Sequence, residues 1–142
     1  MTISRCEGER VVRIAAAVVV NARGQTLLVR KQGTRAFMQA GGKIGPGETA
    51  PAALAREIRE ELGCAVESCR PLGQFRAPAA HEEGWTVEAD LFAVTLCGEV
   101  SPAAEIVEIV WRAPDQIDGL TLAPLTRDHV LPLIRALPEI AA

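Results

Sequence analysis

Runs of apolar and β-branched residues, separated by turn-forming residues, recur along the chain and predict β-strands. We expect five strands, at about residues 11–20, 25–30, 68–76, 85–97 and 105–112. The first two flank the segment Asn21-Ala22-Arg23-Gly24, which is typical of the turn of a β-hairpin. The pattern therefore predicts that the chain begins with two adjacent antiparallel strands.

Between the second and third of these runs, the spacing of apolar positions predicts an amphipathic helix from about Thr49 to Leu62. Thr49 is a suitable N-cap, Pro51 lies in the first turn, and Gly63 follows the last residue. Helices favour these residue types at these positions, so we expect the helix to begin and end close to these boundaries.

A second helix is expected near the end of the chain, over roughly residues 125–137. Pro132 interrupts this segment, so the start of the helix is expected as late as Leu131. A short helical turn is also predicted at residues 115–117, just after Pro114. Strands on both sides of a central helix, with another helix at the end, indicate an α/β fold built in layers.

The length of 142 residues indicates a single domain, residues 1–142, that is long enough to bury a core. Apolar residues (49%) and charged residues (23%) have the balance of a soluble globular protein, which excludes a coiled coil or a disordered chain. The apolar run within residues 11–20 is far shorter than the ~20 residues that span a bilayer. The formal net charge of −3 leaves no basic excess for nucleic acid or an anionic membrane, and the apolar content permits a homodimer.

The four cysteines are Cys6, Cys64, Cys69 and Cys97, and no two of them have the CxxC spacing of a zinc site. Their even number allows two disulfides, but a chain with this apolar content does not depend on such cross-links. We therefore expect reduced cysteines and a cytoplasmic location.

Acidic side chains are concentrated on the predicted central helix, where Glu57, Glu60 and Glu61 lie within five positions. On a helical wheel these carboxylates project from one face, beside an apolar stripe. The stripe consists of Leu54, Ala55, Ile58 and Leu62. Glu57 and Glu61, four residues apart, repel each other and destabilise the helix by about 0.2–0.5 kcal/mol. They also lie near the C-terminal end of the helix, where the helix dipole disfavours anions. Such hard oxygen ligands suit Mg²⁺ or Mn²⁺, which would offset the repulsion; the alternative is a solvated acidic face.

The segment before this helix, Gly41-Gly42-Lys43-Ile44-Gly45-Pro46-Gly47-Glu48, contains four glycines in eight residues. It lacks the Gly-Lys-Ser/Thr sequence of a phosphate-binding P-loop. Its backbone can approach other groups closely, and its carbonyl oxygens are candidates for further metal ligands. A glycine-rich loop that leads into a helix with an acidic edge is much rarer than either part alone, so the combination favours a metal site.

The segment from Gly42 to Cys64 resembles the Nudix box, whose pattern is G-x5-E-x7-R-E-U-x-E-E-x-G-U, with U a bulky aliphatic residue. The fixed positions are occupied by Gly42, Glu48, Arg56, Glu57, Ile58, Glu60, Glu61 and Gly63. Cys64 stands at the last aliphatic position, where a buried cysteine packs as a small apolar residue. Weaker similarity to the family extends over residues 37–43 and 105–117.

The resemblance implies the Nudix fold, an α/β/α sandwich with a mixed β-sheet in which the box forms a loop–helix–loop. It also implies a divalent-metal-dependent pyrophosphohydrolase, using Mg²⁺ or Mn²⁺, that cleaves the phosphoanhydride bond of a nucleoside diphosphate linked to a moiety X. A (d)NTP or a modified nucleotide is the expected substrate, while nucleotide sugars, ADP-ribose and dinucleoside polyphosphates remain open. The alternative is a non-catalytic, nucleotide-sensing Nudix module.

The resemblance also implies roles for single residues of the box. Glu57, Glu60 and Glu61 resemble the metal ligands, and Glu57 or a neighbour resembles the base that deprotonates water. The carbonyl oxygen of Gly42, or of Gly41, is a candidate additional ligand. The remaining pair of fixed residues resembles the ion pair that orients the catalytic helix. This pair consists of Arg56 and Glu48.

Residues other than the fixed positions of the box are further candidates for the site. Glu108 is the first choice for an additional acidic metal ligand, and Glu105 is the second. Arg30 and Lys43 are candidate substrate-binding residues, and Lys31 beside Arg30 could also contact phosphates. Glu82 or Glu83, in a predicted hairpin turn, could reach the site, but a solvated turn is the favoured interpretation of both.

Overall fold

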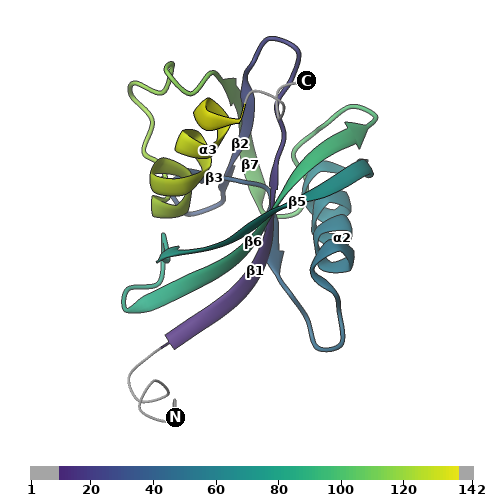
Figure 1. The fold of residues 1–142 in the computed structure, drawn as a ribbon, viewed down its shortest axis with the longest axis vertical. Helices are drawn as coiled ribbons and strands as arrows, with labels where there is room; N and C mark the ends of the chain where they lie inside the picture. The colour runs from purple at the N-terminus through teal and green to yellow at the C-terminus, as the bar shows by residue number, and fades with distance from the viewer. Residues whose placement is uncertain (1–9, 138–142) are drawn as a thin grey trace.

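The computed structural model describes residues 10–137, which form two sheets with helices packed against them (Figure 1). A four-stranded sheet has the order β4-β1-β6-β5, and a three-stranded sheet has the order β3-β2-β7. The strands of the first sheet are β1 (Arg10–Val18), β4 (Gly41–Lys43), β5 (Ala65–Pro78) and β6 (Trp85–Cys97). Those of the second are β2 (Thr26–Lys31), β3 (Phe37–Met38) and β7 (Ile106–Arg112). Strands β1 and β6 pair in parallel and the other pairs are antiparallel, so the first sheet is mixed.

The prediction that the first two strands pair as a hairpin holds only at the turn and is wrong for the rest of the strands. Val20 and Thr26 form an antiparallel bridge, and the Leu27 N–H donates to the Val19 carbonyl at 3.0 Å. Beyond this turn β1 and β2 diverge into different sheets. Residues 15–18 are buried on both faces of β1, so the hydrophobic pattern carries no information about which strand lies beside it.

The other strands lie close to their predicted positions. Strand β6 covers the predicted residues 85–97, and β7 begins one residue later than expected, at Ile106. Strand β5 begins at Ala65 and is longer than predicted, with register shifts at two places along its pairing with β6. Most of its side chains are exposed, which removes the alternation that marks a half-buried strand.

The central helix α2 (Ala50–Leu62) confirms the predicted boundaries. The Thr49 hydroxyl accepts a hydrogen bond from the Ala52 N–H at 3.2 Å, and thereby caps the first turn. Gly63 adopts the left-handed conformation (φ 71°), and its N–H donates to the Arg59 carbonyl at 3.1 Å. Both ends are therefore fixed by local hydrogen bonds.

The C-terminal helical segment begins near the earlier of the two predicted starts, with residues 124 and 125 already helical. It continues through a π-helical turn, η1 (Thr126–Val130), into α3 (Leu131–Ala136), which has Pro132 in its first turn. The predicted helical turn at residues 115–117 is wrong. The Gln116 N–H donates to the Ala113 carbonyl at 2.8 Å and closes a simple turn there.

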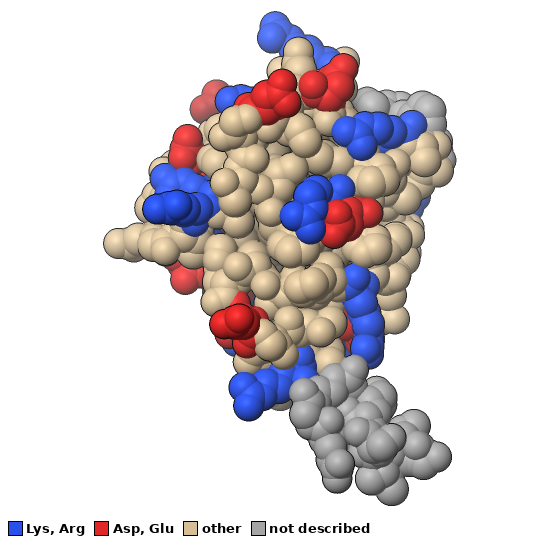
Figure 2. Space-filling view, turned by 90° about the vertical axis from the view of Figure 1, so that its left-hand side faces the viewer, with Lys and Arg blue, Asp and Glu red and all other residues tan. Residues whose placement is uncertain are grey.

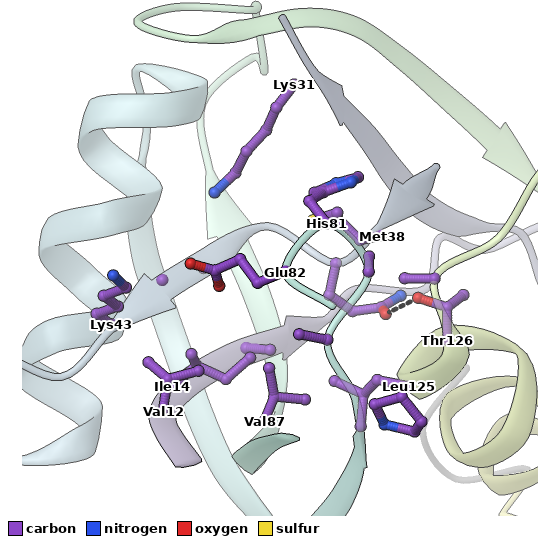
Figure 3. Close-up of a pocket in the computed structure, with 18 residues that line it drawn as sticks. Val12, Ile14, Lys31, Met38, Lys43, His81, Glu82, Val87, Leu125 and Thr126 are labelled. Atoms are coloured by element: carbon purple, nitrogen blue, oxygen red, sulfur yellow. Dashed lines mark hydrogen bonds between the residues drawn. The ribbon is translucent and has the colours of Figure 1, made fainter. Parts of the chain in front are cut away.

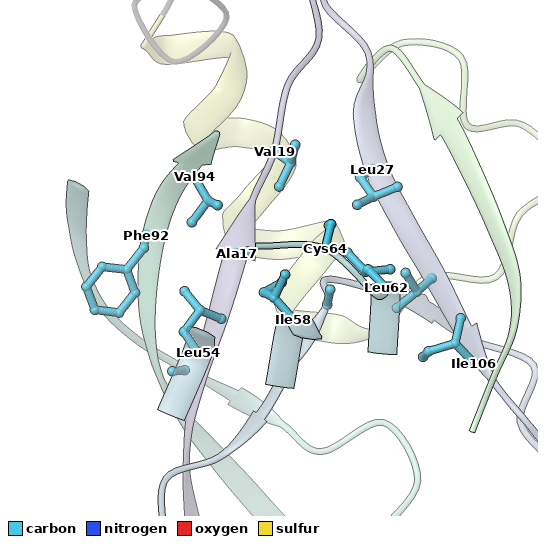
Figure 4. Close-up of a cluster of buried hydrophobic side chains, with 13 residues drawn as sticks. Ala17, Val19, Leu27, Leu54, Ile58, Leu62, Cys64, Phe92, Val94 and Ile106 are labelled. Carbon is cyan, nitrogen blue, oxygen red and sulfur yellow. The ribbon is translucent and has the colours of Figure 1, made fainter. Parts of the chain in front are cut away.

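Two apolar clusters lie on opposite sides of the four-stranded sheet, and they define the α/β/α sandwich. On one side Leu54, Ile58 and Leu62 of α2 pack against the sheet (Figure 4). On the other side Val130 and Leu131 pack at the start of α3. Strand β1 serves both clusters because its side chains alternate between the two faces. Ala15, Ala17 and Val19 belong to the first cluster, and Ala16 and Val18 to the second.

The described cysteines are free: Cys64 is buried in the cluster beneath α2, as expected, and Cys69 and Cys97 are exposed. Cys6 lies outside the described residues. No helix within residues 10–137 is long and apolar enough to cross a membrane.

Candidate active site

The carboxylate of Glu61 is buried where α2 packs against β4. The residue is 3% exposed, and its Oε1 accepts a hydrogen bond from the Gly41 N–H at 3.1 Å. Burial raises the pKa of this carboxyl to about 8; the Gly41 N–H and the charge of Lys31 act in the opposite direction, while the neighbouring Glu57 raises it further. A negative charge at Glu61 is therefore unfavourable unless a cation lies nearby.

Gly42 allows the Glu57 carboxylate to lie directly against the backbone of β4. A Cβ atom at Gly42 would lie 2.5 Å from the Glu57 Cδ, closer than real contacts allow. The requirement for glycine at this box position therefore has a steric cause: any side chain would displace Glu57 from its place beside Glu61.

Arg56 binds three of the box carboxylates and fixes the loop to the helix. Its Nε donates to Glu48 Oε2 at 2.8 Å and its Nη2 to Glu48 Oε1 at 2.9 Å. Its Nη1 donates to Glu57 Oε2 at 3.0 Å and lies 3.5 Å from Glu60 Oε1. This bidentate geometry is the favourable one for an arginine and a carboxylate, and it determines where the end of the glycine-rich loop lies relative to α2.

Glu48 is also hydrogen-bonded by the loop that precedes it, since the Gly45 N–H donates to its Oε1 at 2.7 Å. The hydrogen bonds from Arg56 and Gly45 lower the pKa of Glu48 to about 2. The pKa of Arg56 is raised by its hydrogen bonds to Glu48 and Glu57. The structure thus brings the expected orienting pair together as a closed ion pair.

The acidic edge and the apolar stripe of α2 overlap instead of lying side by side. Glu61 is buried with the apolar residues, the Glu57 side chain is 17% exposed, and the Glu60 side chain is 53% exposed. The expectation that Ala55 lies in the stripe is wrong: Ala55 is exposed and Ala53 is buried in its place. The carboxylates therefore extend from the buried face of the helix to solvent.

Within residues 10–137, no three acidic, histidine or cysteine side chains are gathered closely enough to form a metal site in their present positions. The donor chemistry nevertheless fits a hard divalent cation, because two carboxylates are held side by side against β4 by Gly42 and the Gly41 N–H. Glu57, Glu60 and Glu61 would hold the cation.

Arg30 and Glu108 pair with each other at 2.9 Å across β2 and β7. Arg30 also donates to the Thr34 carbonyl at 2.9 Å, and neither Arg30 nor Glu108 lines the cavity described below. The neighbouring residue Lys31 does line it, and its Nζ lies 3.7 Å from Glu105. The structure therefore brings Lys31 closer to the carboxylates than Arg30.

A cavity of about 180 Å³ lies between β1, β4, the β5–β6 loop and the segment before η1 (Figure 3), and none of the carboxylates of α2 is among the residues that line it. Its walls are largely apolar, and they include Val12, Ile14, Ala16, Met38, Val87 and Leu125. Gly41, Gly42 and Lys43 form the wall that it shares with α2. His81 and Glu82 of the β5–β6 loop also line it, whereas Glu83 does not.

Sequence reasoning missed two polar residues of this cavity, Gln39 and Thr126. The Thr126 hydroxyl donates to Gln39 Oε1 at 2.7 Å, and both residues are buried. A glutamine inside the short apolar run before the box was a local signal for Gln39. Thr126 lies 87 positions further along the chain, and nothing in the sequence connected the two.

The NUDIX domain family model matches residues 10–134, which is most of the chain. The chain therefore belongs to the Nudix family and is a Nudix hydrolase. The box residues described above are the part of the sequence in which this membership is most visible.

Two curated relatives are similar to parts of the chain. A Bacillus subtilis (strain 168) protein, provisionally named 8-oxo-dGTP diphosphatase, is 28% identical over 105 residues, which is 72% of this chain and 67% of that protein. The RNA pyrophosphohydrolase of Serratia proteamaculans (strain 568) is 39% identical over 59 residues, 42% of this chain. That match spans only 34% of the Serratia protein.

Solved structures show the same fold at low sequence identity. The MutT protein from Methanosarcina mazei Go1 superposes with a TM-score of 0.75 at 22% identity, covering 92% of this chain and 97% of that one. The E. coli ORF135 protein superposes with a TM-score of 0.68 at 24% identity, covering 94% and 93%. These likenesses establish the architecture and leave the substrate to be argued from the site.

Proposed function

We propose that this hydrolase is a divalent-metal-dependent pyrophosphohydrolase whose substrate is a (d)NTP or a modified nucleotide. The observation that carries the proposal is the wall of Gly41, Gly42 and Lys43. One side of this wall lines the cavity, and on the other the Gly41 N–H and Gly42 hold Glu61 and Glu57. A nucleotide whose base occupies the cavity therefore has its phosphates next to the carboxylates.

The size of the cavity limits what enters it. About 180 Å³ is well below the roughly 300–1,000 Å³ of sites that enclose a drug-sized ligand. It suits one ring system, with the remainder of the ligand outside. The curated relative named for 8-oxo-dGTP supports a nucleoside triphosphate over larger dinucleotides.

A divalent cation, Mg²⁺ or Mn²⁺, supplies charge neutralisation of the diphosphate and acidification of a bound water. Glu57, Glu60 and Glu61 hold the cation in this proposal, with the Gly42 carbonyl as a further ligand. Arg56 acts as a positioning residue through Glu48. Lys43 and Lys31 are placed to contact the phosphates from the cavity side. Glu108 is a weaker candidate because it is paired with Arg30.

The experiment is release of phosphate or pyrophosphate from a panel of nucleotides, with Mg²⁺ or Mn²⁺ and with excess chelator. The panel includes the four NTPs, 8-oxo-dGTP, a nucleotide sugar, ADP-ribose and an RNA carrying a 5′ triphosphate. We expect metal-dependent turnover of at least one nucleoside triphosphate. Tight nucleotide binding with no turnover of any compound would instead favour the non-catalytic sensing module.

A matched pair of variants assigns the activity to this site. Glu60→Gln is expected to reduce kcat by orders of magnitude with an unchanged circular dichroism spectrum. Glu67→Gln is the control, because Glu67 is an exposed glutamate on β5 whose Oε1 accepts from Thr95 at 3.2 Å, as an amide oxygen also can. Near-normal rates in Glu60→Gln would contradict its assignment as a metal ligand.

A further inference from the structure

The cavity contains a buried amide whose hydrogen bonding is incomplete. Gln39 is 5% exposed, and its Oε1 accepts from the Thr126 hydroxyl at 2.7 Å. Its Nε2 is also buried and has no hydrogen-bond partner within residues 10–137. Buried donors without a partner are rare in folded proteins, because the lost hydration is not replaced. An unsatisfied donor in the wall of a cavity points to a ligand that completes it.

This amide is held against Thr126. Thr126 is fully buried at the start of η1, and its hydroxyl donates to the amide oxygen, which leaves the two amide N–H groups for another partner. The two segments are joined by backbone bonds as well: the Phe37 N–H donates to the Thr121 carbonyl at 2.8 Å, and the Ala123 N–H donates to the Phe37 carbonyl at 2.9 Å. These bonds keep Gln39 and Thr126 together, and in this arrangement the amide N–H groups are the ones left to a ligand.

Gln39 and the carboxylates lie at opposite ends of one cavity wall. Figure 3 shows Thr126, the hydrogen-bond partner of Gln39, at one end of the cavity and Lys43 at the other. Gly42 lies three positions after Gln39, which corresponds to about 10 Å of extended chain. A nucleotide can span this distance with its base at the Gln39 end and its phosphates at the Gly42 end.

We propose that Gln39, oriented by Thr126, is the base-selecting residue of this site and that it donates to a carbonyl oxygen of the base. The inference rests on the proposed function, because it assumes that the ligand of the cavity is a nucleotide. It assigns the substrate to the keto bases, guanine (oxidised guanine included), uracil and thymine, in preference to adenine and cytosine.

The preference follows from what each base edge presents. Guanine offers O6 and N7 side by side as acceptors, and uracil and thymine offer O4. Adenine has no carbonyl oxygen, and its N7 lies next to an exocyclic amino group, which is a donor. Cytosine carries its amino group where uracil has O4, and its one carbonyl oxygen, O2, lies beside the glycosidic bond. Beside Gln39 the cavity wall is formed by Met38, Ala123 and Leu125, whose side chains offer that amino group no strong acceptor. A site built around a buried donor therefore discriminates against the amino bases.

The test compares kcat/KM for GTP and UTP with that for ATP and CTP in the wild-type protein and in Gln39→Leu. Wild type is expected to favour the keto bases by about tenfold or more in kcat/KM. A buried donor that stays unpaired raises the free energy of the bound complex by an amount that corresponds to about this factor. Gln39→Leu is expected to lose this preference through a rise in KM for GTP and UTP. Gln116→Leu, at an exposed glutamine in the loop after β7, is the control and is expected to retain it.

A second variant tests the same inference without changing Gln39, so the test does not depend on whether Gln39→Leu folds. Thr126→Val removes the hydroxyl that orients the amide and keeps the shape of the side chain. Thr126→Val is expected to reduce the preference for keto bases without abolishing turnover, because the amide is then free to turn its oxygen into the cavity. Thermal unfolding of both variants identifies any loss of fold.

Binding of GMP and AMP in the presence of chelator separates this inference from the proposed function. If no nucleotide is hydrolysed but wild type binds GMP more tightly than AMP and Gln39→Leu does not, the base selection stands and the proposed function fails. If triphosphates are hydrolysed without a keto preference, or if the preference persists in Gln39→Leu, the base selection is wrong. A preference for ATP and CTP would equally overturn it, because it requires the amide oxygen to face the ligand.

Discussion

At the scale of single residues, the ion pair between Glu48 and Arg56 joins the glycine-rich loop to the helix that carries the other carboxylates. Its two hydrogen bonds, at 2.8 and 2.9 Å, hold the guanidinium so that its third nitrogen reaches Glu57. Neither residue needs to touch a substrate for this purpose. Both therefore act by placing Glu57.

The Glu48 carboxylate is expected to stabilise the fold in a pH-dependent way. Its pKa in the folded protein is about 2, below the ordinary value of 4.5, so the stabilisation is present above pH 4.5 and is lost as the pH falls toward 2. The free energies of unfolding of wild type and Glu48→Gln, measured with urea, should therefore differ by the full amount at pH 7 and by progressively less as the pH falls from 4.5 to 2. A difference that is independent of pH would show that the carboxylate charge is not involved.

Replacing Arg56 by lysine tests its positioning role. Lysine keeps the positive charge but cannot make the two parallel hydrogen bonds to Glu48. We expect kcat and the apparent affinity for Mg²⁺ to fall by about 10–100-fold, as for other residues that orient metal ligands. A normal Mg²⁺ titration with a reduced kcat would instead place Arg56 in contact with the substrate.

At this scale the sequence predicted residue identities better than their surroundings. Glu57, Glu60 and Glu61 were expected on one exposed edge, because a helical wheel records polarity and not the position of the neighbouring strand. Burial of Glu61 depends on β4, which turns the Gly41 N–H toward it. Gln39 was missed for the same reason, since its partner Thr126 is distant in the sequence.

At the scale of secondary-structure elements, α2 is the element whose local sequence determines its boundaries. Thr49 and Gly63 provide hydrogen bonds to the backbone at the two ends, and neither depends on tertiary contacts. This is why both ends of α2 were predicted, while the partners of β1 were not. Strand pairing is decided by residues that meet only after folding.

The N-cap can be tested by substitution of Thr49. Thr49→Ala removes the hydroxyl that accepts from Ala52 and is expected to lower the free energy of unfolding by about 1 kcal/mol. Thr49→Ser keeps the hydroxyl and should cost little. Equal losses in the two variants, measured by urea denaturation, would show that the methyl group rather than the cap is responsible.

At the scale of the whole molecule, the charges are dispersed apart from the carboxylates around α2. On the face drawn in Figure 2, lysine, arginine and acidic side chains are scattered over a mostly uncharged surface. With a formal net charge of −3, the chain has no general attraction for a polyanion. The proposed function therefore requires that Lys31, Lys43 and a bound cation attract the nucleotide to the site.

Divalent cations are expected to stabilise the folded protein in the absence of nucleotide. A ligand at 100 times its Kd contributes about 2.7 kcal/mol, so saturating Mg²⁺ or Mn²⁺ should raise the Tm measurably. Glu57→Gln should abolish most of this shift, and Glu67→Gln should retain it. An equal shift in both variants would show that the cation binds elsewhere.

The most direct test of the account is a crystal structure with Mn²⁺ and a non-hydrolysable GTP analogue, in which anomalous scattering locates the metal. The account predicts an anomalous peak at the carboxylates of Glu57, Glu60 and Glu61, with the phosphates beside Gly42 and the base next to Gln39. A metal bound away from α2, or a base outside the cavity between β1 and η1, would contradict it.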